Sequence, residues 1–292
     1  QYGPSVSDRF PQQAATVRNY IAQAYFLRAL VHLDLCLVYG QTYTYSSDAS
    51  HLGTAVMTTI PDVKSKIARS SASVTYKQIL GDLQTALDMF ADGWTKGCFY
   101  ASPAACKALV ARVCLYMGNY SDAKKYASEV ISDYGLSLTP RADYVAMFCG
   151  RKEGNEAIFR LNGLSGTAKL RSMFDYTSPQ MYPSGKLLDI FSSDASVWTG
   201  SDVRSEQLSY KAADGTEYSG VCMKFIDTED IAETQKRYDP FVLRLSEMYL
   251  IRAEAACHAG DTDTAVSDIA TLEARARGEK ASHITVTFTG ID

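Results

Sequence analysis

Hydrophobic residues recur every three or four positions in several long segments of the chain, which is typical of amphipathic helices. The first such segment runs from Pro11 to Tyr39 and ends at Gly40. The second runs from Thr75 to Phe90. Residues 41–74, which lie between them, lose this period and are rich in Ser, Thr and Tyr, so they predict a long loop. The pattern therefore predicts two helices with a loop inserted between them.

Two later segments share one arrangement of small residues. In each, an Ala is followed seven positions later by a Gly and five positions after that by another Ala; the residues are Ala111, Gly118 and Ala123, and Ala253, Gly260 and Ala265. Small residues let two antiparallel helices approach closely, and Gly accepts a left-handed turn between them. Each segment therefore predicts a helical hairpin that resembles a tetratricopeptide unit. We expect the helices ending at Gly40 and starting near Thr75 to form another pair.

Residues 134–242 differ from the rest because Gly, Ser, Thr, Asp and aromatic residues dominate there. We expect loops, short strands such as 157–159 and 221–225, and one short helix around 186–191. The fold class predicted is mainly α. One domain over residues 1–292 is expected, in which a helical scaffold of residues 11–133 and 243–277 carries a loop-rich, ligand-binding insertion of residues 134–242.

Charge and composition exclude several classes of function. The net charge is −4 and the basic residues are scattered, so we expect no nucleic-acid partner. No apolar stretch approaches the roughly 18 to 20 residues of a membrane-spanning helix. The four His show no metal-ligand spacing, so we expect no metal and no cofactor. Seven Cys form no CxxC pair, and Cys36, Cys106, Cys114 and Cys257 lie in apolar helical patterns, which predicts buried small side chains.

Five segments resemble characteristic segments of the SusD/RagB family, and they occur in the family's order. They are AQAYFLRALVHLDLCLVYG with its Arg28-Ala29-Leu30, TYKQILGDLQTALDMF, KALVARVCLYMGNYSDAKKYASEVI, NEAIFRL and VLRLSEMYLIRAEAACHAGDTDTAVSDIATLEARA. After Gly40 the family usually has an acidic residue and a Val-Pro pair, which are absent here. The family's lipid-attachment Cys, its opening helices and its usual segment after Gly278 are not evident, so we expect a partial chain.

The resemblance implies a SusD-like helical scaffold and a role without catalysis. Members of the family are lipoproteins on the surface of a bacterial outer membrane, held there by an N-terminal lipid anchor, which we expect to lie outside this chain. The implied function is to bind an oligosaccharide or polysaccharide and deliver it to a SusC-like TonB-dependent transporter for nutrient uptake. Two alternatives are a helical-repeat scaffold for protein interaction and a RagB-like protein that captures peptides. A glycoside hydrolase is a third, which would need two paired carboxylates.

Sugar binding needs aromatic faces and a few polar groups. Candidates outside the helical periods are Trp198, Tyr182, Tyr176, Phe174, Tyr43, Tyr45 and Trp94, with Asp48 as a polar partner. The alternative for each aromatic residue is that it anchors a loop onto the core.

Charged residues in the last of the five segments suggest acid or base chemistry at first sight. They are Arg244, Glu247, Arg252 and Glu254. Arg and Glu residues at helical spacing mostly form ion pairs that belong to the scaffold. No catalytic residue is therefore expected. Asp202 and Arg204 resemble a family Asp-x-Arg motif, for which a structural salt bridge is expected.

Overall fold

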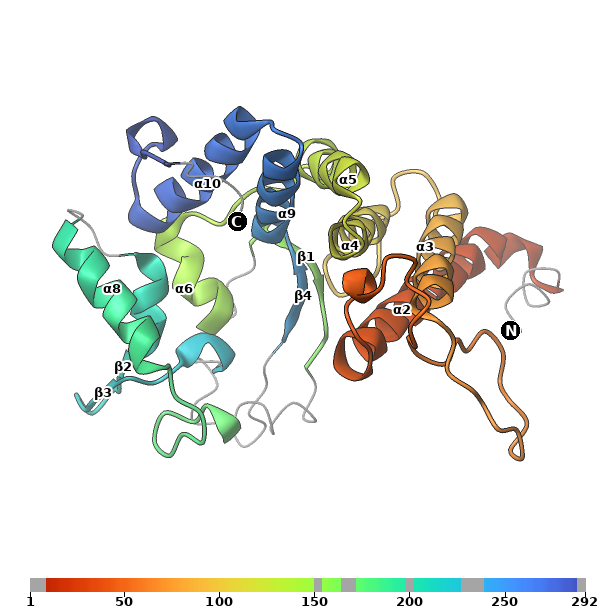
Figure 1. Cartoon of the computed structure of the whole chain (residues 1–292). Coiled ribbons are helices and arrows are strands. Elements are labelled where there is room, and N and C mark those ends of the chain that lie inside the picture. The colour runs from red at the N-terminus through yellow and green to blue at the C-terminus, as the bar shows by residue number, and fades with distance from the viewer. Residues whose placement is uncertain (1–8, 150–153, 164–171, 198–201, 227–238, 288–292) are drawn as a thin grey trace. The chain divides into compact units, whose positions relative to one another are not determined.

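Helices account for most of the computed structural model, which describes residues 9–149, 154–163, 172–197, 202–226 and 239–287 (Figure 1). The mainly α fold class is therefore confirmed. The chain divides into two compact units. The first comprises Gln1–Tyr134 with Ile251–Asp261, and the second comprises Gly135–Leu250 with Thr262–Asp292. The expectation of a single domain with a scaffold and an insertion stays a prediction.

The first unit is built on a pair of long helices, as the hydrophobic period predicts. Helix α2 spans Ala14–Tyr39, after a 3-10 turn η1 at Pro11–Gln13, and α3 spans Ala72–Met89. The two helices pack along their apolar faces, and Phe26 and Leu33 of α2 are fully buried, like Ile79 and Leu83 of α3. Burying such side chains contributes about 1.5 to 3 kcal/mol each.

The loop between α2 and α3 is closed at its base by backbone pairing. A bridge joins Leu52 to Ser71, and Arg69 donates to the carbonyl of Gly53 at 2.7 Å. Ser71 then caps α3 by accepting from the amide of Val74 at 3.2 Å. Apart from this bridge and the 3-10 turn η2 at Tyr43–Tyr45, residues 41–70 are irregular, as the loss of the helical period predicts.

The first predicted hairpin is confirmed. Helices α4 (Pro103–Tyr116) and α5 (Tyr120–Asp133) pack on each other. Gly118 lies between them at φ +73°, the left-handed region that a side chain disfavours. Residues 251–261 join this unit through α5: the Tyr120 and His258 rings stack with centroids 3.8 Å apart, and Lys124 pairs with Asp261 at 2.5 Å.

Helix α2 lies in a strongly apolar segment. An 18-residue window within Pro11–Tyr39 has a mean hydropathy of 1.5, enough by length and composition for a membrane span, so the expectation that no stretch approaches such a span is wrong for this segment. The central helix of a water-soluble core meets the same criterion. In this structure α2 buries one face against α3 and carries Arg28 to an ion pair with Asp82, so it acts as a core helix.

The second unit combines short strands with helices. Strand β1 (Ala157–Arg160) pairs antiparallel with β4 (Phe241–Arg244), and β2 (Ser209–Lys211) pairs antiparallel with β3 (Glu217–Ser219). The other elements are α6 (Arg141–Cys149), α8 (Gly185–Val197), η4 (Val203–Leu208), η5 (Met223–Phe225), α10 (Thr262–Arg277) and η7 (Ala281–His283). The short strand at 157–159 and the helix around 186–191 are thus confirmed.

Helix α9 (Leu245–His258) begins in the second unit and ends in the first. It leads through Gly260, at φ +74°, into α10, so both helices and the turn of the second predicted hairpin are present.

Three details differ from the sequence predictions. Helix α6 lies in a stretch where only one short helix, near residue 186, was expected. Its apolar residues are buried in the core, so tertiary packing stabilises the helix although the polar residues around it in the sequence do not predict one. The apolar stretch 221–225 forms the 3-10 turn η5 instead of a strand. Residues 243 and 244 belong to β4, so the helical part starts at Leu245.

All seven cysteines lie in the part of the chain that the structure describes, and they form no disulfide bond. Cys36, Cys106 and Cys114 are buried as predicted, whereas Cys257 is only half-buried. Burial raises the pKa of the Cys114 thiol to about 11 and that of Cys106 further still.

Candidate functional site

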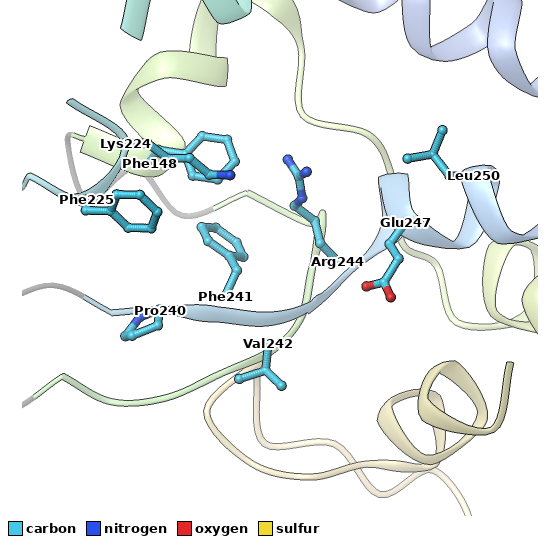
Figure 2. Close-up of a pocket in the computed structure, with 9 residues that line it drawn as sticks. All are labelled: Phe148, Lys224, Phe225, Pro240, Phe241, Val242, Arg244, Glu247 and Leu250. Atoms are coloured by element: carbon cyan, nitrogen blue, oxygen red, sulfur yellow. The ribbon is translucent and has the colours of Figure 1, made fainter. Parts of the chain in front are cut away.

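A pocket of about 360 Å³ opens beside strand β4 in the second unit (Figure 2). Its lining residues are Phe148, Lys224, Phe225, Pro240, Phe241, Val242, Arg244, Glu247 and Leu250. They come from the end of α6, the turn η5, strand β4 and the start of α9. The pocket therefore depends on segments that are distant in the sequence.

Aromatic rings form one side of this pocket. The centroids of Phe148 and Phe241 lie 5.1 Å apart with an interplanar angle of 56°. Phe225 packs on Phe174, with centroids 4.5 Å apart. Tilted and edge contacts of this kind are the favoured geometry for aromatic pairs and fix the ring positions.

Two cations lie against the same ring. The Nζ of Lys224 is 5.2 Å from the centroid of Phe148, and the guanidinium carbon of Arg244 is 5.1 Å from it. Burial lowers the pKa of Lys224 from its ordinary value of 10.5, and the neighbouring charge of Arg244 lowers it further. The pocket thus holds positive charge that is partly removed from water.

A buried carboxylate holds the base of the pocket in place. Glu156, which is fully buried, accepts from the amide of Thr139 at 2.8 Å and from Arg275 at 2.9 Å. Its backbone carbonyl accepts from the amide of Leu245 at 2.9 Å, next to Arg244. The pairing of β1 with β4 and this network fix the backbone from which Arg244 and Phe241 project.

Aromatic faces together with fixed cations suit reversible binding of a ligand. Among its described lining residues the pocket has one carboxylate, that of Glu247, whereas glycoside hydrolysis generally uses two. In the part of the chain that the structure describes, no cluster of three His, Cys, Asp or Glu could hold a metal ion.

The expected site residues of the first unit lie in two places. Tyr43, Tyr45 and Asp48 share the loop that follows α2. Tyr43 is half-buried on Tyr76, with centroids 4.8 Å apart, whereas Tyr45 is 66% exposed. Asp48 is exposed and accepts from the amide of Ser50 at 3.1 Å.

Trp94 lies after α3 and is half-buried. It donates from Nε1 to the carbonyl of Ala101 at 3.2 Å, and its ring stacks on Phe90. These contacts are those of a residue that anchors a loop, and a ligand role for Trp94 stays a prediction.

The expected site residues of the second unit also include both packed and exposed aromatic side chains. Phe174 packs on Phe225, and Tyr176 packs on Tyr210 and Tyr218 with centroids 4.7 and 4.9 Å apart. These contacts attach their loops to the core, and a ligand role for either residue stays a prediction. Tyr182 is 66% exposed. Trp198 lies outside the described residues.

One arginine of each charged motif singled out in the sequence lies within ion-pair distance of a carboxylate. Arg204 holds Asp202 through two guanidinium nitrogens, at 2.9 and 2.5 Å, as expected for a structural salt bridge. Although burial alone would raise it, these hydrogen bonds keep the pKa of Asp202 below its usual value. In the second motif, Arg244 belongs to strand β4 rather than to a helix, and its guanidinium lies 3.6 Å from Glu156.

Sequence reasoning missed most of the pocket. The candidates did not include Phe148, Lys224, Phe225 or Phe241. Arg244 was interpreted as part of the scaffold. Phe148 and Phe241 are more than ninety positions apart in the sequence and meet only through tertiary packing. An apolar stretch ending in Lys224 and Phe225 was visible, but nothing local shows that it faces a pocket.

Family models match both ends of the chain. A family described as "Starch-binding associating with outer membrane" matches residues 6–115, and the SusD family matches residues 156–287. Together the two matches place the chain in the SusD/RagB family. The SusD match contains Lys224, Phe225, Phe241 and Arg244 of the pocket. Among curated proteins none matches this chain.

Solved structures of SusD-like proteins share the fold. A SusD superfamily protein from Bacteroides vulgatus matches with a TM-score of 0.78 at 23% identity, over 94% of this chain and 62% of that one. One from Bacteroides thetaiotaomicron matches with a TM-score of 0.77 at 23% identity, over 93% and 62%. A protein named as a putative sugar binding protein from Bacteroides vulgatus gives 0.77 at 24% identity, over 92% and 60%. The chain thus spans about three fifths of these SusD-like proteins.

Proposed function

We propose that this SusD-family protein binds a carbohydrate at the surface of a bacterial outer membrane and delivers it to a SusC-like TonB-dependent transporter for nutrient uptake. The observation that carries the proposal is the pair of family matches, 6–115 and 156–287, which follow each other along one chain. One of these families is described as starch-binding and associated with the outer membrane. A similar structure is named as a sugar binding protein.

Exposed aromatic side chains support carbohydrate binding. Tyr45 and Tyr182 are each 66% exposed. Tyr45 ends the short 3-10 turn η2 and Tyr182 lies in an irregular segment, so neither is on an α-helix. A tyrosine ring offers an apolar face for the C–H groups of a sugar and a hydroxyl for its polar edge. With Tyr43, Trp94, Phe174, Tyr176, Trp198 and Asp48, they form the set of residues that we propose for ligand contact.

The proposed role is binding without chemistry on the sugar. Purified protein should release no reducing sugar from any polysaccharide that it binds. We further propose that an N-terminal lipid holds the protein at the cell surface, which places the site where polysaccharide arrives.

Affinity electrophoresis tests the proposal. The protein is run through native gels that contain plant, host or microbial polysaccharides, beside the variants Tyr182→Ala, Tyr45→Ala and Trp198→Ala. Tyr182→Phe keeps the ring, and Tyr20→Ala removes an exposed tyrosine from helix α2 as a matched control. Retardation by one polysaccharide that an alanine variant loses and both controls keep supports the proposal. Retardation by none contradicts it and favours capture of peptides or a scaffold for protein interaction.

Delivery needs a separate test. The full-length protein, expressed in a bacterium that carries its transporter, should co-purify with a TonB-dependent outer-membrane protein. Purification of the lipoprotein alone under mild detergent would contradict this part of the proposal.

A further inference from the structure

Lys224 is a half-buried cation in the aromatic pocket. Its Nζ lies 5.2 Å from the centroid of Phe148 and 5.8 Å from that of Phe225. Among the described residues, no carboxylate lies within ion-pair distance of it, and the groups that perturb its pKa after burial are Arg244 and the thiol of Cys222. A cation that is partly removed from water without a counter-ion is unfavourable, and an anion in the pocket would relieve this cost.

Arg244 adds a second positive charge. The nearest described carboxylate is that of Glu156, whose Oε1 lies 3.6 Å from Nη1, longer than a normal hydrogen bond. Glu156 already accepts from Arg275 at 2.9 Å and from the amide of Thr139 at 2.8 Å. One buried carboxylate therefore serves two arginines, and the charge of Arg244 is only partly compensated.

The cations and the rings lie on one side of strand β4. Figure 2 shows the guanidinium of Arg244 and the ring of Phe241 rising on the side of Phe148 and Lys224, whereas the carboxylate of Glu247 points the other way. Glu247 is also not among the charges that affect the pKa of Lys224. The positive side of the pocket is thus separate from its acidic residue.

The size and walls of the pocket limit the ligand. Its volume of about 360 Å³ is at the small end of ligand pockets, which span roughly 300 to 1,000 Å³. A pocket of this size suits a single sugar residue of a longer chain. Phe225 and Phe241 provide apolar ring surface next to the cations. A ligand that fits both features has an apolar face and one anionic group.

We infer that this pocket binds a carboxylate-bearing sugar, such as a uronic acid residue, with Lys224 and Arg244 on the carboxylate and the rings of Phe225 and Phe241 against the sugar face. The inference rests on the proposed function and adds the class of sugar. The protein's net charge of −4 opposes non-specific attraction of an acidic polymer, so any such binding requires a local positive site.

The test compares acidic polysaccharides with neutral forms of the same chains. Polygalacturonate, alginate and a glucuronate-rich polysaccharide are used in affinity electrophoresis, each beside its carboxyl-reduced form. The variants are Lys224→Gln, which removes the charge, and Lys224→Arg, which keeps it. Lys211→Gln is the matched control, because Lys211 is 68% exposed and pairs with the exposed Glu217. Circular dichroism verifies that every variant is folded.

The expected result is retardation by at least one acidic polymer and not by its reduced form. Lys224→Gln should weaken this binding about ten- to a hundredfold, as expected for a lost hydrogen bond between charged groups, whereas Lys224→Arg and Lys211→Gln should bind within about threefold of the parent.

Four results would overturn the inference. Binding of neutral polysaccharides alone, unchanged in Lys224→Gln, rejects the acidic sugar and leaves the proposed function intact. Acidic binding that Lys224→Gln retains places the anion elsewhere. Binding of acidic peptides, with no binding of a polysaccharide, rejects both the inference and the proposed carbohydrate function. The absence of binding to every neutral and acidic polymer also rejects both.

Discussion

The guanidinium of Arg28 holds the carboxylate of Asp82 through two hydrogen bonds, from Nε at 2.7 Å and from Nη2 at 2.5 Å. The side chain of Asp82 is 2% exposed and that of Arg28 is 28% exposed. Gln78 donates to the same carboxylate at 2.7 Å. This cluster joins α2 to α3 across a long loop, and its two charged members come from two of the segments that resemble the family.

Replacing Asp82 should destabilise the first unit. Asp82→Asn keeps the shape but leaves Arg28 without its counter-ion, so we expect the free energy of unfolding to fall by about 2 to 4 kcal/mol. Urea unfolding followed by circular dichroism measures the change. Asp88→Asn is the matched control, because Asp88 is exposed on the same helix, and it should change stability by less than about 0.5 kcal/mol. Equal effects of the two variants would mean that the pair is not important for stability.

His32 should make stability depend on pH. It is buried, its Nε2 accepts from the amide of Met57 at 3.0 Å, and burial lowers its pKa below 6.5, with Arg28 adding to the effect and Asp82 opposing it. As pH falls below about 6.5, the unfolded chain binds a proton that the folded state resists. The free energy of unfolding should therefore fall from pH 6.5 down to the folded-state pKa.

The contribution of His32 can be isolated by substitution. Thermal unfolding between about pH 8 and about pH 5 should show a smaller loss of stability at low pH in His32→Gln than in the parent. His283→Gln removes a histidine that is 58% exposed and should leave the pH profile unchanged. An unchanged profile in His32→Gln would contradict this account.

Glu156 should be essential for the second unit. Its carboxylate is fully buried and serves Arg275, whose side chain is 12% exposed, and the amide of Thr139. Glu156→Gln leaves Arg275 as an uncompensated buried charge, which costs about 3 to 5 kcal/mol. Glu217→Gln, at a position that is 73% exposed, should cost less than about 1 kcal/mol. Chemical denaturation of both variants measures the difference, and similar midpoints would show that the buried network is dispensable.

Substitution of two tyrosines should separate binding from folding. Tyr176 packs on Tyr210 and Tyr218, so Tyr176→Ala should lower the unfolding free energy by about 2 to 4 kcal/mol. Tyr182 is 66% exposed, so Tyr182→Ala should change stability by less than about 0.5 kcal/mol while it weakens retardation by the bound polysaccharide. Unfolding curves and affinity gels on the same preparations check both. A stable Tyr182→Ala with undiminished retardation would remove Tyr182 from the proposed site.

The cysteines should react at different rates. Burial raises the pKa of Cys114 to about 11, so its thiolate is rare at neutral pH, and Cys106 is buried more deeply. Iodoacetamide labelling of the native protein, read by peptide mass spectrometry, should modify the half-buried Cys98, Cys222 and Cys257 well before Cys106 and Cys114. Rapid labelling of Cys106 would contradict the packing of α4.

The long helices could be predicted from the sequence because their burial is periodic. Phe26 and Leu33 repeat on one face of α2, and the turns at Gly118 and Gly260 need a residue that tolerates positive φ. Helix α6 could not be predicted in the same way. It is a helix of nine residues, and the core partners that stabilise it, such as Val203 and Met223, lie far along the chain.

The candidate site could be predicted only in part. Irregular segments rich in aromatic residues were recognisable, and Tyr45 and Tyr182 are indeed exposed. The pocket of Phe148, Lys224 and Arg244 was hidden, because long-range packing decides which charged residues lie against aromatic rings and which lie beside a carboxylate. Each of these residues has an ordinary local context, and their significance follows from the few ångströms that separate them.

Helix α9 belongs to both units, since the boundary falls between Leu250 and Ile251 in its middle. The chain also passes from one unit to the other after Tyr134 and after Asp261. No stretch of consecutive codons therefore encodes either unit by itself. Producing the pocket-bearing unit alone would require joining Leu250 to Thr262 with a designed linker, and cutting the gene in two would divide a helix instead of separating two modules.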